Sequence, residues 1–329
     1  MKSTIQIFSE LGVRLAEFGS DEVSRSVVAR AVAENEWFSV EDIRFAVEAL
    51  RSEMLDGDKV AQWLSHYPSA GLHAPRRVAI IMAGNIPLVG FFDLMCVIAS
   101  GNIPCVKPSS KDRVLEEYIE QLLCDIEPTL RIEEYREDEK YDAVIATGGD
   151  SANLYFQNAF EGIPCLLRGS RHSVAVLSGK ESKEDILHLA DDIFRYSGLG
   201  CRNVSLLFVP KGYRLSLPIR KMGRAYRNNY LQCRALLTMQ NKRFSDLGSA
   251  LIVESGAEFP RFLSQVNVVE YYDLEEVCGW LAASDEVLQC VVSHIEGLHS
   301  REVAFGRAQL PTLFDYADER DTMQFLTRL

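Results

Sequence analysis

A cysteine flanked by glycines is the clearest candidate for chemistry in this chain. Cys201 follows Gly198 and Gly200, and Arg202 comes directly after it. Glycines beside a thiol leave room for a substrate and let the backbone bend beneath it, and a neighbouring guanidinium can favour the thiolate, the nucleophilic form. Residues 204–210 form an apolar run typical of a buried strand, so the thiol lies where a helix gives way to a strand. The alternative is an unreactive buried cysteine, a common state for an intracellular thiol.

Two other segments place a polar side chain just after a predicted strand. Asn85 follows the strand 77–83, and its amide can donate to a carbonyl oxygen that becomes negative. Lys107 ends the strand 103–107 ahead of a helix, where a lysine suits the ribose or phosphate of a nucleotide. The alternative for Asn85 is an ordinary turn asparagine, and the alternative for Lys107 is a lysine exposed to solvent.

A glycine turn follows a third predicted strand. Thr147-Gly148-Gly149 comes after the predicted strand 142–146 and before a predicted helix at 151–160. Glycines at the start of a helix can admit a phosphate close to backbone N–H groups. The pattern lacks a complete GxGxxG motif, so simple turn chemistry is the alternative.

Strands and helices alternate along the chain from residue 76 onward, which predicts a parallel sheet with helices on both faces. We therefore predict an α/β fold of two adjacent Rossmann-like domains. A helical N-terminal segment is expected over residues 1–75. A nucleotide-binding domain is expected over 76–178, completed by 300–329, and a catalytic domain carrying Cys201 over 179–299.

Composition limits the class of protein. The 329 residues suffice for roughly two domains, and the formal net charge of -12 argues against binding of nucleic acid or anionic membranes. The eight cysteines show no CxxC pair and no zinc-finger spacing, so we expect no metal site and reduced thiols in a cytoplasmic protein. The N-terminus lacks an apolar signal core. The longest apolar stretch, residues 88–99, contains Asp93 and is too short to span a bilayer, so no stable membrane insertion is expected.

In this order along the chain, the candidate segments resemble the aldehyde dehydrogenase superfamily, and most closely its LuxC-type acyl-CoA reductases. Residues 81–87 resemble the superfamily's Asn-containing turn, and residues 99–109 resemble its "AGN…V.KPS" segment. Residues 146–149 resemble its "TGS" turn, and residues 197–201 resemble its "GQxC" segment. Residues 168–177 and 303–309 resemble segments of the LuxC-type branch. The resemblance covers roughly residues 75 to 329, and its combination of motifs is more specific than any one of them.

The resemblance implies an aldehyde dehydrogenase-like fold and the NAD(P)H-dependent reduction of an acyl thioester to an aldehyde. The substrate would be acyl-CoA or an acyl-carrier thioester. Cys201 would be the nucleophile that carries the acyl group, and Asn85 would donate to the oxyanion. The residues implied in cofactor binding are Lys107, Ser109, Ser110, Thr147, Gly148 and Gly149.

Two departures from the superfamily pattern refine the prediction. Arg168 stands where hydrolytic aldehyde dehydrogenases have the glutamate of an "ELGG" segment, which activates water. Without that base, an acyl-cysteine is hydrolysed less easily and can exchange with another thiol. Ser110, followed by Lys111, stands where many NAD-dependent relatives have a glutamate that binds ribose hydroxyls and repels a 2′-phosphate. We therefore predict NADPH as cofactor, with NADH as the alternative.

Two rival functions stay open at this point. One is a non-acylating aldehyde dehydrogenase, against which Arg168 argues. The other is a cofactor-free acyl-thioester transferase or acyl-binding protein, against which the intact Lys107-Pro108-Ser109 argues. His172 and His294 are candidate bases, but no motif places either beside Cys201. The chain is also much shorter than typical members of the superfamily, which leaves open whether it is a homo-oligomer and whether it keeps the whole substrate tunnel.

Overall fold

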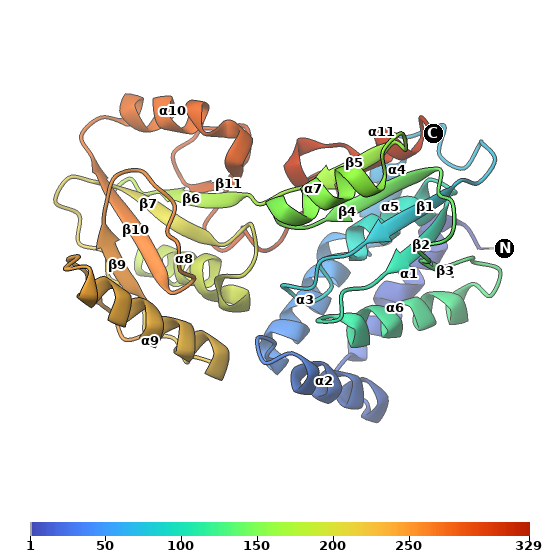
Figure 1. Cartoon of the computed structure of the whole chain (residues 1–329), viewed down its shortest axis with the longest axis horizontal. Helices are drawn as coiled ribbons and strands as arrows, with labels where there is room; N and C mark the ends of the chain where they lie inside the picture. The colour runs from blue at the N-terminus through green and yellow to red at the C-terminus, as the bar shows by residue number, and fades with distance from the viewer. Residues whose placement is uncertain (1) are drawn as a thin grey trace. The chain divides into compact units, whose positions relative to one another are not determined.

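The computed structural model describes residues 2–329, apart from the side chain of Asp150. The chain divides into two compact units (Figure 1). Unit 1 contains the residues up to Ser170 together with Pro311–Leu329, and unit 2 contains Arg171–Leu310. Among the described residues, no helix has the length and apolar character that crossing a membrane requires.

Unit 1 is built on a five-stranded parallel sheet in the order β3-β2-β1-β4-β5. Its strands are β1 (Arg77–Ile81), β2 (Ile103–Lys107), β3 (Glu133–Glu134), β4 (Ala143–Thr147) and β5 (Cys165–Arg168). The chain moves outward from β1 through β2 to β3, then returns to the other side of β1 for β4. The strand order therefore changes direction between β1 and β4, which is the topological switch point of the sheet.

Helices on both faces cover this sheet, as the alternating pattern predicts. They include α5 (Phe91–Ala99), α6 (Arg113–Ile126), α7 (Asp150–Ala159) and the short α11 (Thr322–Leu326). Four N-terminal helices, each capped by a Ser or Asp side chain, are α1 (Thr4–Arg14), α2 (Glu22–Glu34), α3 (Val40–Glu53) and α4 (Gly57–Leu64). These four share one core with the sheet, because Phe8 and Trp63 pack in the same cluster as Ile80 and Leu94. Residues 1–75 are therefore part of unit 1.

Unit 2 contains a seven-stranded sheet in the order β12-β11-β6-β7-β10-β9-β8, in which only the β8–β9 pair is antiparallel. Its elements are β6 (His172–Val176), α8 (Lys183–Phe194), β7 (Val204–Pro210), α9 (Arg224–Met239), β8 (Ser245–Asp246), β9 (Leu251–Glu254), β10 (Gln265–Tyr271), α10 (Leu274–Ala283), β11 (Leu288–Ser293) and β12 (Glu302–Val303). Successive residues of β7 pack on opposite faces of the sheet, Leu207 in the core with α8 and Leu206 in the core with α10; Figure 1 shows the two helices.

The boundaries of the two units differ from the predicted ones. The change from unit 1 to unit 2 falls at Ser170 and not at residue 178, because β6 pairs with β7 and β11 of the unit 2 sheet. The return to unit 1 falls at Pro311 and not at residue 300. Residues 300–310 stay in unit 2, because β12 pairs with β11 and the carboxylate of Asp192 accepts the N–H groups of Gly306 and Ala308.

A buried ion pair joins three elements of unit 1. The guanidinium of Arg168, at the end of β5, donates to the carboxylate of Asp93 on α5. It also donates to Oγ1 of Thr322 on α11 at 2.7 Å. Each of the three residues is less than 10% exposed. Removing one member of such a pair leaves an uncompensated charge in the interior.

Two buried carboxyl groups of α6 lie beneath the turn between β1 and α5. Asp112, the N-cap residue of α6, accepts the N–H of Leu88 at 2.6 Å. Leu88 has a left-handed backbone with φ 56°, which is strained for a leucine. Glu116 is fully buried one turn further along α6. Burial raises the pKa of both carboxyl groups well above the ordinary range, and the charge of Asp112 raises the pKa of Glu116 further.

We expect Arg168→Ala to lower the free energy of unfolding by about 3–5 kcal/mol, because Asp93 would stay buried without its partner. Urea unfolding measures the loss, and Arg320→Ala, which removes an exposed arginine of the same unit, is the control. The double variant Asp93→Ala/Arg168→Ala should lose much less than the sum of its single variants. Additive losses, or a loss below about 1 kcal/mol for Arg168→Ala, would contradict the role assigned to the pair.

We expect the stability of the protein to fall as the pH rises above about 4.5, the pKa of an unfolded glutamate. Above this pH, folded Glu116 keeps its proton while the unfolded chain releases it. The free energy of the unfolded state therefore falls relative to that of the folded state. Glu116→Gln should weaken this decline and raise the free energy of unfolding near pH 7.5, because a glutamine has no proton to release.

Urea unfolding between pH 5 and 8 tests this expectation for Glu116. The control is Glu117→Gln, which changes an exposed neighbour on the same helix. A pH dependence that stays the same in Glu116→Gln would show that this carboxyl group is ionised in the folded protein.

Candidate functional site

Cys201 lies in a tight loop of unit 2 between α8 and β7. After α8, the chain makes a 3₁₀ turn at Arg195–Gly198, in which Tyr196, Ser197 and Gly198 are all left-handed, with φ of 54°, 57° and 73°. Only glycine adopts this conformation without steric cost. Cys201 follows this turn three residues before Val204, the first residue of β7, and its side chain is exposed.

Cys201 differs from the other cysteines in its access to solvent. The structure describes all eight, and Cys201 is the one whose side chain is exposed. Burial raises the thiol pKa of six others, which are Cys96, Cys105, Cys124, Cys165, Cys233 and Cys290. Because a thiol reacts as its thiolate, these six are poorer nucleophiles. The exposure contradicts the alternative of an unreactive buried cysteine at position 201.

Two buried polar side chains hold the Cys201 loop. Asn203 accepts the N–H of Gly200 through its Oδ1 at 2.8 Å, and Ser173 donates its hydroxyl to the carbonyl oxygen of Cys201 at 2.8 Å. The sequence analysis assigned no role to either. The one feature of the sequence that could have indicated a role for Asn203 is its position directly after Cys201 and Arg202.

In unit 1, the predicted residues gather at the carboxyl ends of three adjacent strands. The last residue of β1, Ile81, is in register with Lys107 of β2 and with Ala146 of β4. Asn85 follows β1 in the next turn, and Thr147 ends β4. The carboxyl edge of a parallel sheet, at the switch point of its strand order, is where nucleotides bind in open α/β folds.

The loops after β1 and β2 touch each other at this edge. A Cβ atom on Gly84 would lie 2.5 Å from Oγ of Ser109, so residue 84 must be glycine for the loops to approach. Asn85 is half-buried beside this contact. Ser110 and Lys111 are exposed at the same edge, where they are accessible to a ligand.

Lys107 extends from the end of β2 with its side chain half-exposed. Its Nζ lies 3.4 Å from Oε1 of Glu137 and 5.1 Å from the ring centre of Tyr135. The ammonium group is therefore held at the sheet edge by a carboxylate and an aromatic face. A cation in this place can donate to the ribose or phosphate of a nucleotide.

The third loop leads from β4 into α7. The N–H of Gly148 donates to the carbonyl of Arg168 at 3.2 Å, and a Cβ atom on Gly148 would lie 2.8 Å from the Cβ of Ala152. Gly149 is the N-cap residue of α7 and is exposed. Gly148 and Gly149 carry no side chain ahead of the helix, so a phosphate can approach the backbone N–H groups there. This edge therefore fits a dinucleotide.

Arg168 cannot act as the base that its position in the family pattern suggests. Its guanidinium is buried and paired with Asp93 and Thr322, and an arginine stays protonated.

The two candidate histidines pack against aromatic rings. His172 stacks on Phe259 with ring centres 4.2 Å apart, and His294 packs edge-on against Phe305. Within the described residues, no three His, Cys, Asp or Glu side chains are grouped to hold a metal ion.

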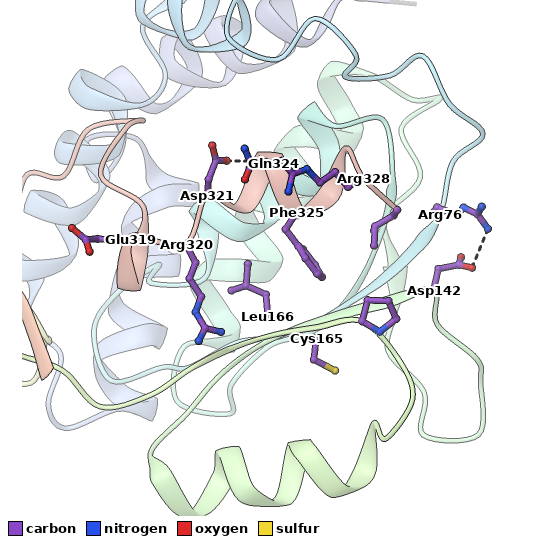
Figure 2. Close-up of a pocket in the computed structure, with 12 residues that line it drawn as sticks. Arg76, Asp142, Cys165, Leu166, Glu319, Arg320, Asp321, Gln324, Phe325 and Arg328 are labelled. Atoms are coloured by element: carbon purple, nitrogen blue, oxygen red, sulfur yellow. Dashed lines mark hydrogen bonds and ion pairs between the residues drawn. The ribbon is translucent and has the colours of Figure 1, made fainter. Parts of the chain in front are cut away.

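A pocket of about 800 Å³ in unit 1 lies at a different place (Figure 2). Arg76, Asp142 and Pro164, which line it, directly precede β1, β4 and β5. Arg76 and Asp142 form an ion pair of 3.5 Å, and Phe325 of α11 points toward β5 (Figure 2). These lining residues mark the amino ends of the strands, and none of the predicted site residues lines the pocket.

Solved structures similar to this chain include aldehyde dehydrogenases. Aldehyde dehydrogenase 21 from Physcomitrella patens has a TM-score of 0.69 at 11% identity, over 99% of this chain and 83% of that chain. A propionaldehyde dehydrogenase from Clostridium phytofermentans has a TM-score of 0.59 at 10% identity, over 89% and 78%. A glyceraldehyde-3-phosphate dehydrogenase from Methanocaldococcus jannaschii, complexed with NADP, has a TM-score of 0.63 at 12% identity, over 89% and 76%. The predicted aldehyde dehydrogenase-like fold is confirmed.

Comparison with curated protein sequences gives no match. A family model described as acyl-CoA reductase (LuxC) matches residues 46–218, more than half of the chain. The matched range includes the turn at Asn85, the end of β2 at Lys107 and the loop at Cys201. The predicted resemblance is thereby confirmed, and the protein belongs to the LuxC family of acyl-CoA reductases.

Proposed function

We propose that this protein reduces an acyl thioester, acyl-CoA or an acyl-carrier thioester, to an aldehyde with NAD(P)H through an acyl-Cys201 intermediate. The observation that carries the proposal is the exposed thiol of Cys201 in its strained, glycine-containing loop. Family membership supports the acyl thioester as substrate.

In the first half of the proposed reaction, the Cys201 thiolate attacks the thioester carbonyl and the carbonyl oxygen becomes negative. The backbone N–H of Cys201 and the side-chain amide of Asn85 donate to that oxygen. The carbonyl then re-forms, the bond to the donor sulfur breaks, and the donor leaves as a thiolate, which takes up a proton from solvent. Cys201 now carries the acyl group as a thioester.

In the second half, the acyl group leaves Cys201 as an aldehyde. A reduced nicotinamide, when bound, supplies the hydride for the carbonyl carbon. The same two donors stabilise the oxygen that becomes negative, and its collapse breaks the bond to Cys201 and returns the thiolate. Because Arg168 is buried, paired and cationic, it activates no water to hydrolyse the acyl-cysteine.

The carboxyl edge of the unit 1 sheet is the proposed cofactor site. Lys107 and the hydroxyls of Ser109 and Ser110 would bind the ribose and its phosphate, and the Thr147-Gly148-Gly149 turn would bind the pyrophosphate. Ser110 and Lys111 are exposed there, and neither repels a 2′-phosphate. NADPH is therefore the proposed cofactor.

We expect Cys201→Ser to lower turnover by at least about 10³-fold, because a hydroxyl is a far weaker nucleophile than a thiolate at neutral pH. The wild type should gain the mass of one acyl group on treatment with acyl-CoA in the absence of NADPH, and the variant should gain none. Intact-mass analysis followed by peptide mapping measures both. Cys165→Ser, which alters a half-buried thiol, should acylate like the wild type. An acyl group that maps to Cys165 or Cys233 would contradict the assignment.

We expect Ser110→Glu to shift the ratio of kcat/KM for NADPH over NADH toward NADH by roughly tenfold, which corresponds to about 1.4 kcal/mol. A carboxylate there would accept the ribose hydroxyls and repel a 2′-phosphate. Ser52→Glu, which adds the same charge at an exposed position of α3, should leave the ratio unchanged. A wild type that strongly prefers NADH, or a ratio indifferent to Ser110→Glu, would show that other residues contact the 2′ position.

A further inference from the structure

We propose that Asn203 and Ser173 are positioning residues for the acylation of Cys201, because together they fix the three peptide groups around the thiol. This inference rests on the proposed function of Cys201 as the acyl carrier. Both side chains are buried, with Asn203 5% exposed and Ser173 fully covered. Both belong to unit 2, as does Cys201.

The side-chain amide of Asn203 closes the end of α8. Its nitrogen donates to the carbonyl oxygens of Asp192, Ile193 and Arg195 at 3.1, 3.2 and 2.9 Å. The last carbonyl groups of a helix have no partner within the helix, so a buried helix end requires such a donor. Asn203 therefore connects the Cys201 loop to a rigid element.

This connection holds a strained piece of backbone. Tyr196 and Ser197 are both left-handed without being glycine, which strains the backbone. Such strain persists only where surrounding contacts determine the backbone. Asn203 supplies these contacts, since it binds Arg195 before the left-handed residues and Gly200 after them.

Asn203 also fixes the two peptide groups that precede Cys201. Its Oδ1 accepts the N–H of Gly200 at 2.8 Å, and its own backbone N–H donates to the carbonyl of Gly200 at 3.1 Å. The peptide bonds are trans, so the N–H of Cys201 points opposite to the Gly200 carbonyl. Asn203 thus determines the direction of the N–H that the proposed mechanism uses at the oxyanion.

Ser173 fixes the peptide group that follows Cys201. Its hydroxyl donates to the carbonyl of Cys201 at 2.8 Å. The hydroxyl oxygen of Ser173 also accepts the backbone N–H of Cys290 on β11 at 3.2 Å. Ser173 lies on β6 in the middle of the unit 2 sheet, so the loop is held against the sheet as well as against α8.

A comparison of two reactions of the same thiol separates positioning from simple access. Acylation by a thioester passes through a negative oxygen that needs an oriented donor. Alkylation by iodoacetamide displaces iodide and has no such oxygen. Loss of positioning should therefore slow acylation much more than alkylation, whereas loss of access or of folded protein slows both together.

We expect Asn203→Ala and Ser173→Ala each to lower the ratio of the acylation rate constant to the alkylation rate constant at Cys201 by at least tenfold. The full chain would be treated with straight-chain acyl-CoAs or with iodoacetamide, and adducts followed by mass and mapped to Cys201. Asn102→Ala is the first control, since Asn102 is a buried asparagine of unit 1 that accepts the N–H of Arg76. Ser293→Ala is the second, since Ser293 donates from β11 to the carbonyl of Val176 at 2.8 Å.

Each outcome has a separate meaning. A ratio within twofold of the wild type in both Asn203→Ala and Ser173→Ala, or an equal fall in both rates, would overturn the positioning role. If Asn203→Ala fails to fold, Ser173→Ala decides by the same ratio. A wild type that is alkylated at Cys201 but never acylated would overturn the proposed function instead.

Discussion

The parallel pairing of β1 with its two neighbours is the constraint on which the candidate nucleotide edge depends. Ile81 at the end of β1 is level with Lys107 on one side and Ala146 on the other, so three loops leave the sheet at the same height. Parallel strands require a crossover connection between them, and the buried helix α5 supplies the one from β1 to β2. Asn85, Lys107 and Thr147 are far apart in the sequence and share an edge only because of this pairing.

Both units hold their candidate loops by the same physical means. In unit 1 the carboxylate of Asp112 binds the N–H of Leu88, and in unit 2 the amide of Asn203 binds the N–H of Gly200. In each loop, non-glycine residues have a left-handed backbone. A buried polar side chain that satisfies backbone groups can keep a strained loop in one conformation. Each loop is therefore tied by a buried hydrogen bond to a helix or strand of its own unit.

Apolar runs made much of the fold predictable. The strands at 103–107 and 204–210 lie where the sequence predicts them. Helix α9 was not predicted, because it is mostly polar and buries only a narrow row of residues that includes Tyr230 and Leu237. The boundary at Ser170 was missed because an apolar strand does not show which sheet it joins. The contacts of Asn203 could not be predicted, since they depend on where α8 ends in space.

The discontinuity of unit 1 has a consequence for its biosynthesis. Thr322 and the buried residues Met323 and Leu326 belong to the core of unit 1, yet the whole of unit 2 precedes them in the chain. At roughly 5–20 residues per second, a ribosome needs about 7 to 28 seconds to make unit 2. During that interval the residues of α11 that complete the core of the first unit have not yet been made. Unit 2, which is continuous, can complete its fold first.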